Sequence, residues 1–423
     1  MRGRRVRGFS VRGRRFLGVA AVVIAIVAFA APATFAAPNA KTIKIGVLAP
    51  ITGPASADGE EFVRGAQLAV NEINKAGGVI GYKFEVVSGD TKDMKPDSVL
   101  SAVNKLVSDK DVGIVLTGYC SNSNFEVKNM ADAGMPYLIA GYPAQTAEII
   151  SPNPDKFPTV WSYSCLFTGY ETDLPVVVEG WAKDGKMTLR DKSVAIIASD
   201  NPYSMTIYNG LKATFKKMGW TITLDEKVPF AEVLDWRVIL GKIRGKVPDL
   251  IVNTDYLPAN GATFVQQFME QPTNSLVFIQ YGPSVPEFLE LTKEQSTGVF
   301  YNYITAPLPT DRTKKIKDAY VGAYGSEPGG YGYTLYEMVY LYADVLKKVG
   351  DPSKKLAVGK AIGALDVKLS AGRLKFDPKT HLALAGNDYI PTVFYQIWDG
   401  ERVLLSPKEY STGEFRLPPW MKR

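Results

Sequence analysis

Short runs of apolar, β-branched residues alternate with helix-length segments, and this rhythm constrains the fold more than any other feature. Thr42–Ala49 is predicted to be a buried strand, and the loop Pro50–Gly59 leads into a helix over Glu60–Ala76. One face of this helix carries apolar residues at helical spacing, and Gly77-Gly78 ends it. Strand, helix and strand in this order predict parallel pairing with right-handed crossovers, which is a doubly wound α/β sheet.

The rhythm continues, breaks once and restarts. The next predicted elements are strands at Lys83–Ser88, Asp111–Leu116 and Pro136–Ala140, with helices at Pro96–Ser108 and after Ser123. Ser151–Pro158 is a proline-rich loop. Beyond it, strands are predicted at Lys192–Ser199, Trp220–Val228, Asp249–Thr254 and Leu276–Gln280, separated by helices near 204–218, 235–245 and 260–270. The chain therefore contains a second region of the same architecture.

The last third is less regular. Gly298–Tyr303 is predicted to be a strand that crosses between the two regions, with helices near 312–324 and 331–349 after it. Pro391–Trp398 and Arg402–Leu405 flank Asp399-Gly400, which is a strong signal for a two-residue hairpin turn.

The positive charge of the chain comes from its first segment. Of 423 residues, 49 are basic and 43 acidic, but residues 1–40 hold seven Arg and no acid, so 42 basic and 43 acidic side chains remain. This balance removes the main support for a nucleic-acid-binding surface. The Arg-rich start, the apolar run Phe16–Ala31 and the small residues after it predict a signal peptide over 1–37, cleaved near Ala36-Ala37. A membrane anchor is the alternative, but the apolar run is short for one. Arg14-Arg15 leaves Sec and twin-arginine export both open.

Cysteine and histidine usage weakens most enzyme interpretations. The only cysteines, Cys120 and Cys165, fit an oxidising compartment, and a disulfide and two free buried thiols stay about equally favoured. The single histidine, His381, lies in a turn-like segment, and the sequence contains no Gly-x-Ser-x-Gly elbow that could supply a nucleophile for it. No Cys/His cluster suggests zinc, and no strand is followed by a Gly-x-Gly-x-x-Gly turn. We predict a protein that is not an enzyme and needs no cofactor.

Several short motifs follow one another along the chain. They are Ile43–Pro50 with Thr52-Gly53-Pro54, Asn74–Val79, Asp90, Cys120–Ser123, Asp200–Tyr203, Pro248–Ile251 and Gly372–Asp377. In this order they resemble the motifs of the type I periplasmic solute-binding proteins. The branch they resemble is the branched-chain amino-acid binding proteins of ABC transporters, and the resemblance spans Ile43 to Leu405. Each is weak alone, and their order makes the match specific.

The resemblance implies two doubly wound, Rossmann-like lobes joined by three crossovers. Lobe one is expected at 41–163 plus 303–388 and lobe two at 164–302 plus 389–423. Such proteins close around one small ligand by hinge motion and dock on membrane permease subunits. We therefore expect an exported, periplasmic importer subunit, monomeric, with a small-molecule ligand and no nucleic-acid partner. A ligand-sensing receptor or an amide-type regulator of the same fold is the alternative. A receptor would need a membrane span after the domain, and a cytoplasmic regulator would not carry the leader.

In open α/β sheets, ligands bind beyond the carboxyl ends of the strands, which directs attention to the loops at 117–124, 141–147, 200–204 and 254–258. Ser121 either caps a helix or also binds ligand, and the resemblance favours the second. In the family, the loop after the fourth strand supplies backbone groups and a hydroxyl to the head group of an amino acid. Here Tyr142 is inserted relative to the family, and either Gln145 or Thr146 occupies the position of that hydroxyl. The predicted ligand-binding residues are Ser121, Tyr142, Ala144, Gln145, Thr146, Tyr203, Tyr256 and Tyr281.

The chain departs from the amino-acid-binding pattern where that branch places a carboxylate against the ligand ammonium. Here the corresponding segment is Gln280–Ser284, which has no acidic residue. Asp58 could replace that carboxylate, although a solvated loop aspartate is the favoured interpretation. Burying an ammonium without a counter-charge is costly. We therefore expect a small organic solute, either an amino acid, an aromatic acid or an amide, and we expect leucine, isoleucine and valine to bind poorly.

Overall fold

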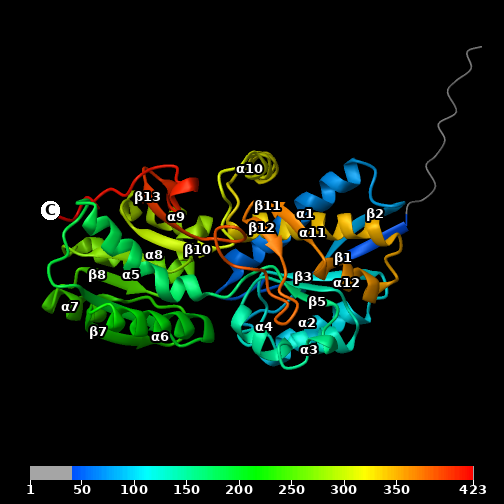
Figure 1. The fold of residues 1–423 in the computed structure, drawn as a ribbon, viewed down its shortest axis with the longest axis horizontal. Helices are drawn as coiled ribbons and strands as arrows, with labels where there is room; N and C mark the ends of the chain where they lie inside the picture. Colours follow the sequence, from blue (N-terminus) through cyan, green and yellow to red (C-terminus); the bar gives the residue numbers. More distant parts are fainter. Residues whose placement is uncertain (1–40, 423) are drawn as a thin grey trace, which may run out of the picture. The chain divides into compact units, whose positions relative to one another are not determined.

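The computed structural model describes residues 41–422, and these fold into two lobes, each built on its own sheet (Figure 1). The predicted leader lies outside the described residues. Lobe one is built on a five-stranded parallel sheet with the strand order β2-β1-β3-β4-β5. Its strands are β1 (Lys41–Ala49), β2 (Tyr82–Asp90), β3 (Val112–Thr117), β4 (Tyr137–Ile139) and β5 (Val160–Ser162).

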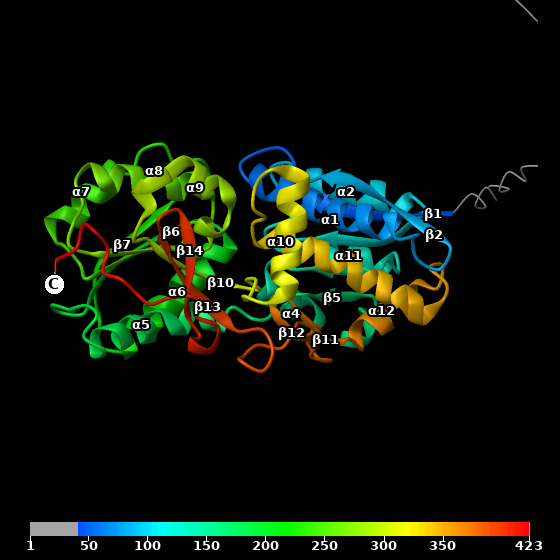
Figure 2. The same ribbon diagram turned by 90° about the horizontal axis from the view of Figure 1, so that it is seen from above.

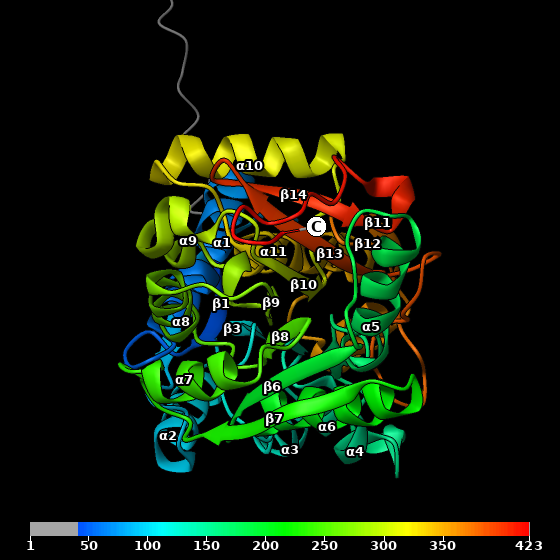
Figure 3. The ribbon, with the colours of Figure 1, turned by 90° about the vertical axis from the view of Figure 1, so that its left-hand side faces the viewer.

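Lobe two is built on a seven-stranded sheet with the order β14-β13-β10-β9-β8-β6-β7, which Figure 3 shows strand by strand. The five neighbouring strands from β10 to β7 in this order pair in parallel, and β13 and β14 form an antiparallel edge. Its strands are β6 (Ser193–Ser199), β7 (Thr221–Val228), β8 (Leu250–Asn253), β9 (Leu276–Ile279), β10 (Phe300–Ile304), β13 (Thr392–Trp398) and β14 (Glu401–Ser406). A separate hairpin joins β11 (Asp366–Leu369) to β12 (Gly372–Lys375).

Helices cover both faces of each sheet (Figure 2). Those grouped with lobe one are α1 (Ser56–Lys75), α2 (Pro96–Ser108), α3 (Glu126–Asp132), α4 (Pro143–Ile150), α10 (Asp311–Tyr324), α11 (Gly330–Val349) and α12 (Lys355–Gly363). Those of lobe two are α5 (Thr168–Lys183), α6 (Pro202–Lys217), α7 (Arg237–Gly245), α8 (Pro258–Glu270) and α9 (Pro286–Thr292). Short 3-10 helices lie at Pro154–Lys156, Gly282–Ser284, Lys293–Ser296 and Lys408–Tyr410.

The sheets are buried on both faces because helices pack on both sides of them. β3, β6, β8 and β9 are buried throughout, as parallel strands under two helical layers require. In lobe one, α2 and α3 pack on one face in a core of their own, while α1 and α11 cover the other. An added Cβ on Gly65 would overlap the backbone of Gly332, so a glycine is what lets α1 and α11 approach this closely.

The chain passes between the sheets three times. It leaves lobe one after β5, returns after β10, and leaves again between the β11–β12 hairpin and β13. The predicted hairpin at Asp399-Gly400 is confirmed, and both residues have positive φ, as a type I′ turn needs. The predicted start of α1 was wrong, because the helix begins at Ser56 within the expected loop. Lobe boundaries at 163/164, 302/303 and 388/389 stay a prediction.

Candidate functional site

A cavity lies where loops of both lobes meet, and together with its mouth, which is open to solvent, it holds about 420 Å³ of space not filled by protein atoms. We call it the tyrosine cavity, because eight tyrosines line it: Tyr119, Tyr142, Tyr170, Tyr203, Tyr256, Tyr281, Tyr303 and Tyr331. The other lining residues are Ala140, Gly141, Ser164, Phe167, Ile304 and Thr305. None of these side chains carries a charge at neutral pH. The cavity is therefore an aromatic chamber with hydroxyl and backbone groups as its polar contacts.

Lobe one contributes residues at the carboxyl ends of its strands and at the start of α11. Tyr119 follows β3, Tyr142 lies just before α4, and Tyr331 is in the first turn of α11. Tyr142 has a φ of 51°, a left-handed conformation that is unusual for a bulky residue and turns the chain sharply into α4. Its hydroxyl donates to Oδ1 of Asn122 over 2.9 Å and lies 3.5 Å from the hydroxyl of Tyr256 in lobe two.

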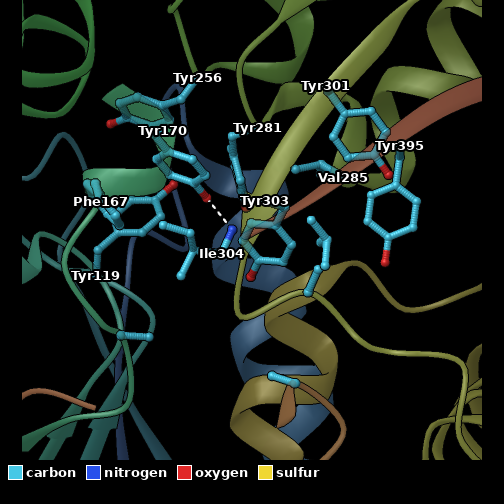
Figure 4. Close-up of a cluster of buried hydrophobic side chains, with 14 of the residues drawn as sticks. Tyr119, Phe167, Tyr170, Tyr256, Tyr281, Val285, Tyr301, Tyr303, Ile304 and Tyr395 are labelled. Atoms are coloured by element: carbon cyan, nitrogen blue, oxygen red, sulfur yellow. Dashed lines mark hydrogen bonds between the residues drawn. The ribbon is translucent and has the colours of Figure 1, made fainter. Parts of the chain in front are cut away.

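Lobe two contributes rings that pack edge to face. Tyr203, in the first turn of α6, packs against Tyr256 with ring centres 5.3 Å apart and planes at 78°, a favoured aromatic geometry. Gln280 donates to the Tyr203 hydroxyl over 3.1 Å. The hydroxyl of Tyr170 accepts the backbone N–H of Ile304 over 2.5 Å, as the dashed line in Figure 4 shows. These two bonds orient the rings of Tyr203 and Tyr170.

A buried carboxylate behind the cavity wall joins the two lobes. Asp58 in α1 is only 2% exposed, and it accepts hydrogen bonds from the hydroxyls of Tyr119 (2.5 Å) and Tyr281 (2.7 Å). Burial raises the pKa of Asp58 to about 6, although the two hydrogen bonds act in the opposite direction. The interpretation of Asp58 as a solvated loop residue was wrong. Its burial depends on Tyr281, which is remote in sequence and belongs to the other lobe.

Comparison with known proteins decides the family. The profile of the periplasmic binding protein family matches residues 42–389. The chain belongs to this family. It is 25% identical to Leu/Ile/Val-binding protein homolog 7 of Brucella abortus over 403 residues, covering 90% of this chain and 96% of that protein.

Solved structures agree with this family of periplasmic binding proteins. A Silicibacter pomeroyi protein, provisionally described as a branched-chain amino acid ABC transporter, shares 30% identity at a TM-score of 0.79, covering 90% of this chain and all of that one. The branched-chain amino acid binding protein LivJ of Streptococcus pneumoniae, solved with isoleucine, matches with a TM-score of 0.69 at 21% identity, covering 87% of this chain and all of that one. The predicted fold class of two Rossmann-like lobes is confirmed.

Four of the predicted ligand-binding residues line the tyrosine cavity of this periplasmic binding protein, and four do not. Those in the lining are Tyr142, Tyr203, Tyr256 and Tyr281. Ser121 is buried, donating to Oε2 of Glu126 over 2.6 Å and accepting from the backbone N–H of Asn124 over 2.9 Å. These bonds support the loop before α3, but Ser121 does not cap that helix, because its N-cap is Phe125 and no side chain bonds to the helix start as a cap. Thr146 is buried and accepts from Nδ2 of Asn124, while Ala144 and Gln145 are half-buried on α4. A role of these four in ligand binding stays a prediction.

Sequence reasoning missed half of the tyrosines in the lining, namely Tyr119, Tyr170, Tyr303 and Tyr331. Tyr119 lies inside the 117–124 loop, which was already singled out, so its aromatic character was the available signal. The other three lie on α5, β10 and α11, where a tyrosine is indistinguishable from a core residue. Only the crossing of the chain between lobes brings them together.

The cysteines and the histidine are core residues. Both thiols are free and buried, so the disulfide interpretation was wrong for this structure. Cys120 lies with α2 and α3 in one core cluster and Cys165 in the other, which separates them. Burial raises the pKa of Cys165 to about 12 and holds that of Cys120 well above its usual value, so neither is a reactive thiolate. His381 stacks on Trp161 with ring centres 3.9 Å apart, and burial lowers its pKa.

Among the described helices, none combines the length and apolar character that crossing a bilayer requires. Membership of the periplasmic binding protein family implies an extracytoplasmic location. The predicted cleavage site near Ala36-Ala37 lies outside the described residues.

Proposed function

We propose that this protein is the solute-binding subunit of an ABC importer and captures one compact organic solute in the tyrosine cavity. The observation that carries the proposal is the cavity itself, which is bounded by both lobes of a periplasmic binding protein and has aromatic rings at nine of its 14 lining residues. The curated and structural relatives bear the names of Leu/Ile/Val-binding and branched-chain amino acid transport proteins, which supports an importer role. Permease subunits in the membrane are the partners this proposal implies.

The chemistry of the lining supports a ligand with an acid or amide head and no ammonium group. No carboxylate is among the residues that line the cavity, and Asp58, which lies behind the wall, already accepts hydrogen bonds from the lining tyrosines Tyr119 and Tyr281. An ammonium would therefore be desolvated without a counter-charge. The N-termini of α4, α6 and α8 lie at cavity-lining loops and carry partial positive charge, which favours an anionic or carbonyl head. The rings favour an aromatic body.

Closure of the lobes would complete the site. The Tyr281–Asp58 hydrogen bond and the approach of Tyr142 to Tyr256 both link lobe one to lobe two. A solute that contacts both walls stabilises this arrangement only by as much as it prefers it over the open one. Lobe-one residues would then hold the ligand first, and Tyr256 and Tyr203 would retain it after closure.

Calorimetry with a panel of solutes tests the ligand class. We expect phenylacetate or phenylacetamide to bind more tightly than leucine, isoleucine and valine by at least about 100-fold, because burying an unpaired ammonium costs several kcal/mol. Tight leucine binding by the wild type would contradict the ligand class but leave the importer role intact. Asp58→Asn is the matched variant: if leucine binds and this change abolishes it, Asp58 serves as the counter-ion.

Small-angle scattering with and without the tightest-binding solute tests closure. Wild type should compact on binding, whereas Tyr256→Ala should compact less and release the solute faster. Leu234→Ala changes an exposed side chain of the same lobe, outside the cavity lining, and is the control. Unchanged compaction of Tyr256→Ala at saturating solute would show that Tyr256 does not drive closure.

A further inference from the structure

A second hollow lies on the other side of Tyr303 from the tyrosine cavity. We call it the back cavity; it holds about 790 Å³ of space not filled by protein atoms and is lined by residues including Ser284, Tyr301, Lys317, Tyr395 and Arg402. Tyr303 lines both cavities. Figure 4 shows its ring between the tyrosines of the first cavity and the pair Tyr301–Tyr395. Elements of both lobes therefore enclose the back cavity as well.

The back cavity differs from the tyrosine cavity in its charge. Arg402 on β14 is half-buried; its Nε donates to the carbonyl of Pro283 over 2.8 Å and its Nη2 to that of Val285 over 3.1 Å. A guanidinium has five N–H donors, and no carboxylate of residues 41–422 lies within 4.0 Å of this one. The second lining cation, Lys317, already pairs with Glu327. Glu327 lines the hollow as well, so among the described residues the lining holds two cations and one carboxylate, and the half-buried guanidinium of Arg402 is the cation without a carboxylate partner within 4.0 Å.

The walls beside Arg402 offer an aromatic surface and an unused hydroxyl. Tyr301 and Tyr395 stack with ring centres 5.2 Å apart and planes at 12°. The hydroxyl of Ser284, which is 6% exposed, has no hydrogen-bond partner among the described residues. A buried hydroxyl without a partner costs free energy that a ligand acceptor can recover. The guanidinium and the unpaired hydroxyl suit a carboxylate, and the two tyrosine rings suit a flat ring that carries it.

We propose that the back cavity is a second ligand site, specific for a compact aromatic carboxylate. The carboxylate binds the free N–H groups of Arg402 and the hydroxyl of Ser284, and the ring lies against Tyr301 and Tyr395. Arginine suits this task because its planar donors match a carboxylate. The site is separate from the tyrosine cavity and does not depend on the identity of the transported solute.

The two cavities share structural supports, so occupancy of one should alter the other. Arg402 holds the carbonyls of Pro283 and Val285, which follow Tyr281 by two and four residues in the segment that carries Tyr281 into the tyrosine cavity. Tyr303 forms a common wall. A carboxylate that draws Arg402 toward itself changes the support of Tyr281 and hence its bond to Asp58. By linkage, the first solute must change carboxylate affinity by the same factor.

Benzoate is the probe, used with the full mature protein. In calorimetry we expect Arg402→Gln to weaken benzoate binding by at least about tenfold, because a charge-assisted hydrogen bond is lost. Thr313→Trp should also block binding, since Thr313 lines the back cavity from a half-buried position on α10. Arg416→Gln is the matched control, because Arg416 stacks over Trp398 and lines neither cavity. Tyr256→Ala, in the first cavity only, should retain benzoate binding.

A crystal structure of the benzoate complex decides the location. A carboxylate within hydrogen-bond distance of Arg402 supports the proposal. Benzoate found only in the tyrosine cavity, or binding that falls in Tyr256→Ala but not in Arg402→Gln, overturns it. Absence of binding at millimolar benzoate, with all variants folded by circular dichroism, overturns it too. None of these results depends on finding the transported solute, so the proposed importer role can fail or stand separately.

Discussion

Buried polar side chains lie in a layer behind each wall of the tyrosine cavity. The two layers differ in how many of their donor and acceptor atoms have a hydrogen-bond partner. Behind the lobe-one wall, Ser121 and Thr146 both make hydrogen bonds, and Nδ2 of Asn124 lies within bonding distance of three acceptors, leaving only its Oδ1 unpaired. Behind the lobe-two wall, buried polar atoms at the strand ends lack partners in the described chain. They are Ser199 Oγ, Asn201 Nδ2, Asn253 Nδ2, Gln280 Oε1 and both amide atoms of Asn302.

This difference separates a rigid wall from an adaptable one. A buried polar group without a partner costs about 1–3 kcal/mol, so the layer behind the lobe-two wall carries a penalty that the layer around Asn124 in lobe one largely avoids. Side chains with unused donors and acceptors can exchange partners when the solute or the lobe arrangement changes. Lobe one therefore presents a fixed surface, and lobe two is the side that adjusts.

The largest effect should come from breaking the lobe-one layer. We expect Asn124→Ala to lower the free energy of unfolding by about 3 kcal/mol, measured by urea denaturation, because bonds to Gly141, Tyr142 and Thr146 are lost. Asn124 also has a φ of 52°, which alanine disfavours. Asn124→Gly loses the same bonds without that strain and should retain about 1 kcal/mol more. A loss below 1 kcal/mol in both would contradict a rigid lobe-one layer.

The next effect concerns the carboxylate that joins the walls. The pKa of Asp58, about 6 in the folded protein, lies above its ordinary value of 3.8. Its protonation therefore favours folding: the gain is complete below pH 3.8 and is lost as the pH rises through 6. The stability of wild type relative to Asp58→Asn should fall by on the order of 2–3 kcal/mol between pH 4 and pH 8. Parallel unfolding curves for the two proteins over this range would show that Asp58 is not desolvated.

A gain in stability is expected on the lobe-two side. Asn302 lies on β10 fully buried, with both ends of its amide unpaired. Replacing it by leucine, which is of similar size and has no polar atoms, should raise the free energy of unfolding by about 1–2 kcal/mol. Asn302→Ala is the companion variant and should not stabilise, because it leaves a void. A destabilised Asn302→Leu would show that the amide has partners in solution.

The smallest effect distinguishes support of the loop before α3 from ligand contact at Ser121. Because its hydroxyl serves Glu126 and the Asn124 backbone, Ser121→Ala should cost about 1 kcal/mol of stability. Solute affinity should change by less than twofold. A tenfold loss of affinity with unchanged stability would instead place this hydroxyl on the ligand, as the family resemblance implied.

The fold was largely predictable because most strands of the two sheets can be recognised from their own residues. Thr42–Ala49 and Lys192–Ser199 were predicted within a few residues of β1 and β6, since continuous apolar runs are typical of strands buried on both faces. α5 was missed, because Pro175 and scattered polar residues obscure its helical period. The hairpin of β11 and β12 was missed as well, since its short strands are mostly polar.

The site was predictable only where it follows from the ends of strands. Tyr203 and Tyr256 were found because they come directly after β6 and β8. Asp58 was misjudged, because nothing near it in the sequence tells that Tyr281 will cover it. The partners of Ser121 were also invisible, since a serine before a helix offers the same signal whether it caps the helix or binds a ligand.

The interleaved path of the chain has a consequence for the order in which the molecule can assemble. The helix α11, which covers α1 in lobe one, begins only at Gly330, and the antiparallel edge of lobe two is made by β13 and β14 near the end of the chain. A growing polypeptide therefore cannot complete either core from its first half, and contacts of high sequence separation make folding slow. Neither lobe can complete its core until nearly all of the protein has been synthesised. No single cut of the chain yields two lobes that each fold alone.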